Sequence, residues 1–145
     1  MSDVQVLYED NHLIAVWKPA GKLTQSAEAG DVSLLEEVRT FLKEKYQKPG
    51  NVFVGLLHRL DRPVEGIVLF AKTSKGASRL SEQIRNGEIK KIYYALVEGT
   101  PEDTTGTLEN MLTWDENKRY AHIDLDSNLP GAKRASLSYK TLSPQ

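Results

Sequence analysis

The sequence predicts an α+β domain, with a mixed and mainly antiparallel β-sheet and two flanking helices. Three observations predict this class. Strand-like segments outnumber helical ones, only two segments carry apolar residues at helical spacing, and polar turns separate neighbouring strands. A chain of 145 residues suits one domain and is long enough to bury a hydrophobic core. We therefore expect one domain over residues 1–145.

Short apolar and β-branched segments predict the strands. The first two span residues 4–8 and 12–17, on either side of a turn-prone Glu-Asp-Asn triplet. Residues 67–71 form a continuous apolar run, which we expect to be buried on both faces of the sheet. Residues 89–97 have the strongest strand composition of all. Three further strands are expected at residues 107–112, 120–125 and 134–142.

Two segments have the apolar spacing of amphipathic helices. The first begins after Ser33, where Glu36 would complete a capping box, and ends before a Pro-Gly pair. The second is capped by Thr73 or Ser74 and ends at an Asn-Gly pair. Its outward face is rich in Lys and Arg.

Composition excludes several classes of site. Cysteine is absent, which excludes disulfides and thiolate metal sites. The N-terminus resembles no secretory signal, and no apolar run is long enough to span a membrane, so we expect a cytoplasmic protein.

The net charge of the chain is -1, but residues 59–91 carry +4 and the rest of the chain carries -5. This uneven distribution of charge suits binding to a polyanion. Taken alone, however, it is better explained by ordinary charged side chains in contact with solvent.

The segment with the strongest chemical signal is His58-Arg59-Leu60-Asp61-Arg62, in a loop that Pro63 and Gly66 stiffen. A carboxylate between two arginines suits a nucleophile or a general base, and it suits a surface ion pair equally well. Judged only from its neighbours in the sequence, Asp61 is expected to form a surface ion pair with Arg59 or Arg62. We predict no metal site, and no glycine-rich phosphate loop supports a nucleotide cofactor.

Residues 58–73 closely resemble the signature of RluA-type pseudouridine synthases, which runs His-Arg-Leu-Asp, a short variable stretch, Gly and an apolar strand ending in Ala-Lys. The stretch Pro63-Val64-Glu65 departs from the common pattern, in which Thr-Ser follows a variable residue. Residues 6–21, with their Trp-Lys-Pro triplet, are similar to the family's first strands. Residues 91–99 are similar to its Lys-x-Tyr-x-Ala-x-Val-x-Gly strand. Residues 133–142 provide a third and weaker match.

The resemblance implies an isomerase that converts uridine in RNA to pseudouridine without a cofactor. Asp61 takes the position of the catalytic carboxylate, whether it attacks covalently or abstracts a proton. Arg59 would fill the space left by the flipped base and pair with phosphate or with Asp61, and Arg62 would contact the RNA backbone. Tyr93 would stack on the uracil ring, whereas Tyr94 fits a core tyrosine on the other side of the strand.

The family pattern continues with a Gly-Arg-x-His-Gln-Ile-Arg segment that does not occur before Gln145. We therefore expect the N-terminal portion of the catalytic domain, with an incomplete fold and without an S4-like RNA-binding domain. The expected partner is ribosomal or transfer RNA, bound by a monomer. The alternative is a catalytically inactive RNA-binding fragment of such an enzyme. A metal-free hydrolase using Asp61 and His58 has little support, because nothing positions a second acid or an oxyanion donor.

Overall fold

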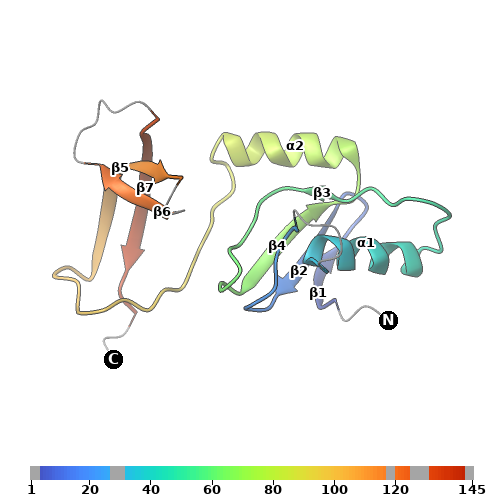
Figure 1. Ribbon diagram of the computed structural model, residues 1–145, viewed down its shortest axis with the longest axis horizontal. Helices are drawn as coiled ribbons and strands as arrows, with labels where there is room; N and C mark the ends of the chain where they lie inside the picture. The colour runs from blue at the N-terminus through green and yellow to red at the C-terminus, as the bar shows by residue number, and fades with distance from the viewer. Residues whose placement is uncertain (1–3, 27–31, 117–119, 125–130, 143–145) are drawn as a thin grey trace. The chain divides into compact units, whose positions relative to one another are not determined.

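The computed structural model describes residues 4–26, 32–116, 120–124 and 131–142. The chain forms two compact units, Met1–Ile92 and Tyr93–Gln145, and each is described by itself (Figure 1). Both helices and most of the strands expected from the sequence are present, and all strand pairs in the described residues are antiparallel. The α+β class is therefore confirmed. Among these residues, no helix combines the length and apolar character that crossing a membrane requires.

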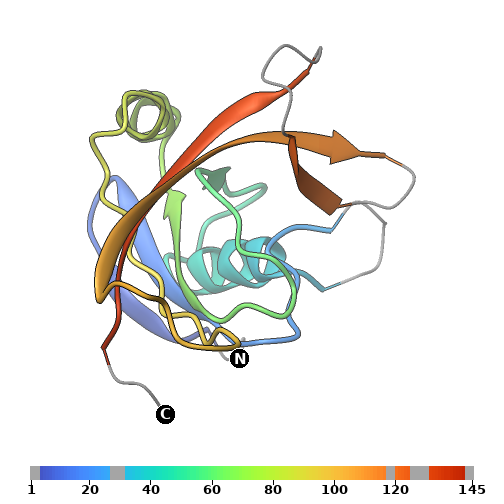
Figure 2. The same ribbon diagram turned by 90° about the vertical axis from the view of Figure 1, so that its left-hand side faces the viewer.

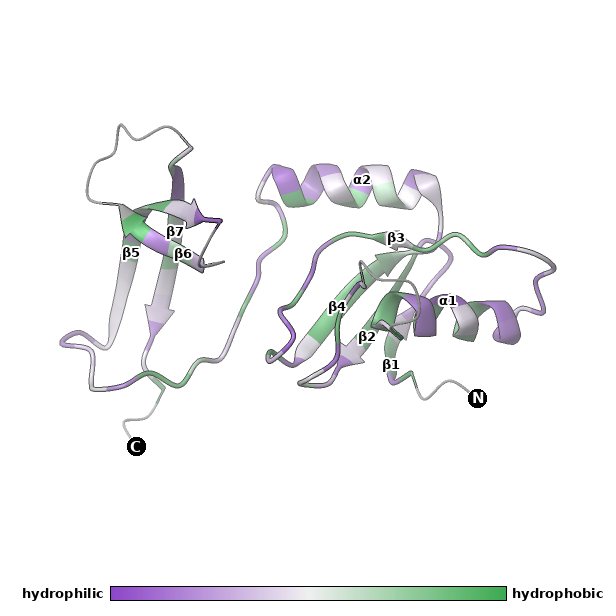
Figure 3. Ribbon diagram, viewed as in Figure 1, coloured by the Kyte–Doolittle hydropathy of each residue, from purple (hydrophilic) through white to green (hydrophobic). Residues whose placement is uncertain are grey.

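The first unit is built on a four-stranded sheet. Its strands are β1 (Val6–Glu9), β2 (Leu13–Lys18), β3 (Gly55–Leu56) and β4 (Gly66–Ala71), in the order β1-β2-β4-β3. The long pair β2 and β4 places Ile14 opposite Phe70 and Val16 opposite Val68. Both central strands are predominantly hydrophobic (Figure 3).

One face of this sheet packs against α1 (Leu34–Lys45), as Figure 2 shows. The helix contributes Val38 and Leu42 to a core that contains Val68 and Phe70 of β4, all four at most 1% exposed. Ile67, the neighbour of Val68, is 54% exposed. The prediction that this strand is buried on both faces is therefore wrong. Successive side chains of a strand point to opposite faces, and α1 covers one of them.

The start of α1 differs from the predicted capping box. Ser33 takes the N-cap position with an extended backbone, but its side chain forms no capping hydrogen bond. The first amides of the helix instead donate to backbone carbonyls of an earlier segment: Leu34 to Leu23 at 2.9 Å and Leu35 to Thr24 at 3.1 Å. These carbonyls satisfy donors that a side-chain cap would otherwise serve. The helix thereby becomes attached to residues 23–24.

The second helix, α2 (Ser74–Arg85), begins as predicted. The Thr73 hydroxyl oxygen accepts a hydrogen bond from the Gly76 amide at 3.0 Å, which is the N-cap interaction. The helix ends at Asn86, and Gly87 follows with φ +70°. Its exposed basic residues are Lys75, Arg79 and Arg85.

The second unit contains a three-stranded antiparallel sheet. Its strands are β5 (Thr105–Asp115), β6 (Tyr120–Asp124) and β7 (Lys133–Lys140), with β5 in the centre. The three strands predicted in this part of the chain are confirmed, although β5 is longer than expected at both ends. Residue 125, the expected end of one strand, lies outside the described residues.

The predicted strand over residues 89–97 is wrong. This segment has no strand structure, and its side chains are largely exposed: Ile92 is 72% and Leu96 88% exposed. A strand is stabilised by hydrogen bonds to a neighbour, and no described strand pairs with this segment. Tyr94 is 86% exposed, so its expected place in a core is also wrong. Strong strand propensity without a partner strand does not produce a strand.

Candidate active site

Asp61 lies in the loop of residues 57–65, between β3 and β4, which we call the Asp61 loop. Its side chain is exposed. Within the described ranges, the Asp61 carboxylate forms no hydrogen bond or ion pair, with Arg59, Arg62 or any other side chain. The surface ion pair that local physics favours is therefore absent from the structure. The carboxylate remains available to an incoming ligand.

The residue before Asp61 is fixed by a buried hydroxyl. Thr24 is 3% exposed, and its Oγ1 donates to the carbonyl oxygen of Leu60 at 2.8 Å. The same oxygen accepts from the Leu60 amide at 3.2 Å. One side chain thus contacts both backbone polar atoms of Leu60. Because Leu60 lies in a loop, these groups have no ladder partner, and the hydroxyl supplies one.

The residue after Asp61 is fixed by the loop that follows β2. The Gly21 amide donates to the Arg62 carbonyl at 2.7 Å, and Arg62 Nε donates back to the Gly21 carbonyl at 3.0 Å. Gly21 has φ +84°, a conformation that glycine adopts without the steric penalty other residues meet. The guanidinium of Arg62 is therefore partly committed to this contact.

A buried lysine adds to the same anchor. Lys18 is fully buried, and its Nζ donates to the carbonyls of Lys22 at 2.7 Å, Pro19 at 3.2 Å and Arg62 at 3.3 Å. Burial lowers the pKa of the Lys18 ammonium, and the charge of Asp61 opposes this effect. The buried cation thus contacts the Asp61 loop and interacts electrostatically with its carboxylate.

His58 anchors the beginning of the loop. Its Nε2 accepts a hydrogen bond from the Leu69 amide of β4 at 3.1 Å. Burial, and then the positive charge of Lys91, lower the pKa of His58. A neutral ring fits both observations, because only an unprotonated Nε2 can accept a hydrogen bond. This role leaves the hydrolase interpretation, in which His58 acts with Asp61, without support.

The remaining predicted residues are exposed. Arg59 projects from the Asp61 loop, and Arg62 is exposed beyond its contact with Gly21. Tyr93 belongs to the second unit and is 63% exposed. The structure therefore brings Arg59, Asp61 and Arg62 together in one loop, and Tyr93 belongs to the other unit. No group of three or more His, Cys, Asp or Glu side chains in the described part of the chain is arranged to bind a metal.

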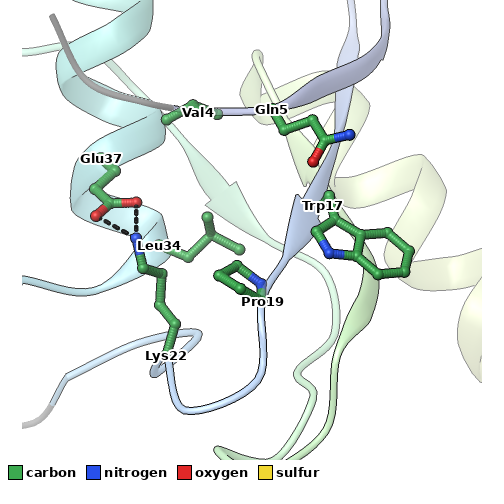
Figure 4. Close-up of a pocket in the computed structure, with 7 residues that line it drawn as sticks. All are labelled: Val4, Gln5, Trp17, Pro19, Lys22, Leu34 and Glu37. Carbon is green, nitrogen blue, oxygen red and sulfur yellow. Dashed lines mark hydrogen bonds and ion pairs between the residues drawn. The ribbon is translucent and has the colours of Figure 1, made fainter.

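A pocket of about 220 Å³ lies beside the loop that follows β2 (Figure 4). Trp17 and Pro19 line one side, and the ion pair of Lys22 with Glu37, at 2.5 Å, lines another. None of the residues predicted for the active site lines this pocket. The candidate site at Asp61 is therefore not this pocket.

Sequence reasoning missed Lys18 and Thr24, which fix the loop. Each contacts a residue of the Asp61 loop that is distant along the chain, by 44 and 36 positions respectively. The only local signal was a lysine placed at the end of an apolar strand, where an unpaired charge is unfavourable. Nothing in the local pattern distinguishes Thr24 from a surface threonine.

Comparison with known proteins relates the chain to one family. Residues 12–145 match the model of the family described as RNA pseudouridylate synthase. The chain is 31% identical over 118 residues to the ribosomal large subunit pseudouridine synthase C of Buchnera aphidicola subsp. Baizongia pistaciae, covering 81% of this chain and 36% of that protein. It is 38% identical over 98 residues to the tRNA pseudouridine synthase C of Haemophilus ducreyi, covering 67% of this chain and 38% of that one.

Two solved human structures share the fold. RNA pseudouridylate synthase domain containing 4 matches with a TM-score of 0.77 and 19% identity, over 97% of this chain and 54% of that one. RNA pseudouridylate synthase domain containing 1 matches with a TM-score of 0.70 and 16% identity, over 94% and 51%. The chain thus spans roughly half the length of these structures, and less of the two bacterial relatives. With the family model matched over residues 12–145, the chain belongs to the RNA pseudouridylate synthase family, and its bacterial relatives indicate the RluA type.

Proposed function

We propose that the protein converts uridine in RNA to pseudouridine, with Asp61 as the catalytic carboxylate. The observation that carries this proposal is an exposed carboxylate that forms no hydrogen bond or ion pair in the described residues, in a loop whose neighbouring backbone is anchored on both sides. A carboxylate committed to a surface ion pair has to be released before it can react. An anchored, unpaired one is already in position.

The reaction requires little more than such a group. The bond between ribose C1′ and uracil N1 breaks, the base rotates, and a bond between C1′ and C5 forms. The proton on C5 is lost and N1 gains one, so atoms and electrons balance without an oxidant or a cofactor. The base must first leave its stack to expose these atoms, and an exposed loop can reach a flipped nucleotide.

The other predicted residues would position the RNA. Arg59 fills the space vacated by the flipped base and pairs with phosphate, for which its planar guanidinium is suited. Arg62 uses Nε for Gly21, which leaves its Nη groups for the RNA backbone. The Tyr93 ring stacks on the uracil. The exposed basic residues of α2 extend the contact with phosphate.

The substrate of the proposed enzyme is ribosomal or transfer RNA. The relatives named above include a ribosomal large subunit synthase and a tRNA synthase, so their names support RNA as the substrate without selecting between ribosomal and transfer RNA.

We further propose that the protein acts in the cytoplasm as a monomer. Size-exclusion chromatography with light scattering measures the oligomeric state directly.

The test uses the longest natural form of the protein that contains this chain, with RNA carrying tritium on uracil C5. Pseudouridine formation releases this tritium to water. Asp61→Ala should reduce the release about 10³-fold while the Kd for RNA changes less than about twofold. Glu65→Gln is the matched control, because it removes another exposed carboxylate of the same loop and should retain activity.

Three results would contradict the proposal. Activity in Asp61→Ala would remove Asp61 from the chemistry. An equal loss in Glu65→Gln would indicate a general effect of charge. RNA binding by the wild-type protein without tritium release, on RNA from both classes, would favour the inactive RNA-binding alternative.

A further inference from the structure

The Thr24 hydroxyl controls the orientation of the peptide group that leads into Asp61. The Leu60 carbonyl and the Asp61 amide belong to one planar peptide unit, and Thr24 Oγ1 donates to that carbonyl at 2.8 Å. The preceding peptide unit contains the Leu60 amide, which donates to the same Oγ1 at 3.2 Å. With both units fixed, the backbone dihedral angles of Leu60 are determined, and so is the direction in which the chain enters Asp61.

Thr24 is itself attached to a rigid element. Its carbonyl accepts from the Leu35 amide at 3.1 Å, and the carbonyl of Leu23 accepts from the Leu34 amide at 2.9 Å. Both amides lie in the first turn of α1, whose Leu34 and Leu35 belong to the hydrophobic core. A continuous series of contacts therefore runs from the core, through α1 and Thr24, to the residue that precedes Asp61.

We propose that Thr24 is a positioning residue for Asp61. This inference rests on the proposed function of Asp61 and deepens it. Without the hydroxyl, the Leu60 carbonyl and amide lose their shared partner, and the entering peptide can rotate. The other side of the loop remains attached, because the Arg62 carbonyl keeps its bonds from Gly21 and Lys18. The carboxylate therefore tilts rather than leaving the loop, which lowers turnover more than RNA binding.

The test compares three variants of the longest natural form of the protein. Thr24→Val removes the hydroxyl and keeps the side-chain shape, whereas Thr24→Ser keeps the hydroxyl. Ser33→Ala is the matched control: it removes another buried hydroxyl, 1% exposed, which forms no capping hydrogen bond. Thermal unfolding of all three records any general loss of stability.

Thr24→Val should lower kcat about 10- to 100-fold with KM for RNA within about twofold, because small displacements of a reacting group have effects of this size. Thr24→Ser should recover most of the turnover. The Leu60 amide, followed by hydrogen exchange without RNA, should exchange about tenfold faster in Thr24→Val and not in Ser33→Ala.

The measurements distinguish failure of the positioning role from failure of the proposed function. An active wild type, an inactive Asp61→Ala and an unchanged kcat in Thr24→Val would overturn the positioning role alone. An equal loss of kcat in Thr24→Ser or Ser33→Ala would also overturn it. If the wild type proves inactive, the proposed function fails, and with it the positioning role in catalysis. The exchange rate of the Leu60 amide still decides whether Thr24 fixes the loop.

Discussion

The two units of the chain differ in how their apolar residues are used. All buried hydrophobic residues in the described part of the chain lie between Ile14 and Ala71, in the first unit. The three strands of the second unit contribute none. The Asp61 loop is therefore carried by a packed scaffold, whereas Tyr93 belongs to a unit that is stabilised mainly by strand pairing. The catalytic role proposed for Asp61 needs exact geometry, whereas the stacking role proposed for Tyr93 needs less rigidity.

The sheet of the second unit nevertheless has two distinct faces. Cross-strand register places Leu108 opposite Leu137 and Leu112 opposite Ile123, and all four belong to one face by the alternation of β5. Leu108, Leu137 and Ile123 are each more than half exposed. The opposite face carries polar pairs, among them Glu109 with Arg134. The described strands of the unit thus have the pattern of a half-buried sheet, and they form no buried core.

The largest expected effect is a difference between the two units in the stability cost of truncating an apolar side chain. Phe70→Ala should lower the free energy of unfolding of the first unit by about 4 kcal/mol, because it leaves a cavity in the core. Leu137→Ala, in the second unit, should cost less than about 1 kcal/mol, since its side chain is 54% exposed. Each unit contains one tryptophan, Trp17 or Trp114. Urea unfolding followed by fluorescence measures the difference, with Trp114→Phe isolating the signal of the first unit and Trp17→Phe that of the second.

A loss in Leu137→Ala as large as that in Phe70→Ala would break the comparison. It would mean that the apolar face of the second unit is packed in solution. The corresponding control on the polar face is Ser136→Ala, which should change the free energy of unfolding by less than about 0.5 kcal/mol.

The ion pairs of the two units should also differ in how much they stabilise the fold. Glu9 is 9% exposed and accepts from Lys72 at 2.6 Å, Lys45 at 2.7 Å and Tyr46 at 2.6 Å, which join β1 to α1 and to the end of β4. Burial by itself raises the pKa of Glu9, but the hydrogen bonds from these groups outweigh it and lower the pKa from 4.5 to about 2. Glu9→Gln should therefore cost about 2 kcal/mol at neutral pH.

The contribution of Glu9 to the free energy of unfolding should depend on pH. Because the folded state has the lower pKa, the Glu9 contribution is complete above pH 4.5 and is lost as pH falls toward 2. Glu9→Gln should remove this part of the acid sensitivity, as measured by urea unfolding at several pH values. The control is Glu109→Gln in the second unit, whose pair with Arg134 is 53% and 70% exposed and should contribute less than about 1 kcal/mol. Equal effects would show that burial does not distinguish the two pairs.

The sequence predicted the elements whose signals are local. The Thr73 cap of α2, the breakers around the Asp61 loop and the strand β5 each depend on neighbouring residues, and all appear in the structure. The errors have a different origin. Residues 89–97 have strand composition, but no described strand pairs with them, and the first amides of α1 use distant carbonyls in place of a side-chain cap.

The candidate site was predictable only in part for the same reason. Asp61 and its two arginines form a recognisable local motif. Lys18 and Thr24 fix that motif through contacts that exist only once β2, α1 and the Asp61 loop are packed together. A sequence pattern can identify the reacting group, but the groups that orient it depend on tertiary structure.

The smallest expected effect tests what stabilises the second unit. A Cβ added to Gly106 of β5 would lie 2.6 Å from the ring of Tyr139 on β7, so this ring covers the glycine backbone. Gly106→Ala should destabilise the sheet by about 1 kcal/mol, because the ring must move aside. In a Tyr139→Ala background the same change should be neutral or slightly stabilising, since alanine restricts the unfolded chain more than glycine does. Hydrogen exchange across β5 and β7 measures this double-mutant cycle, and equal costs in both backgrounds would show that the ring contact does not stabilise the pair.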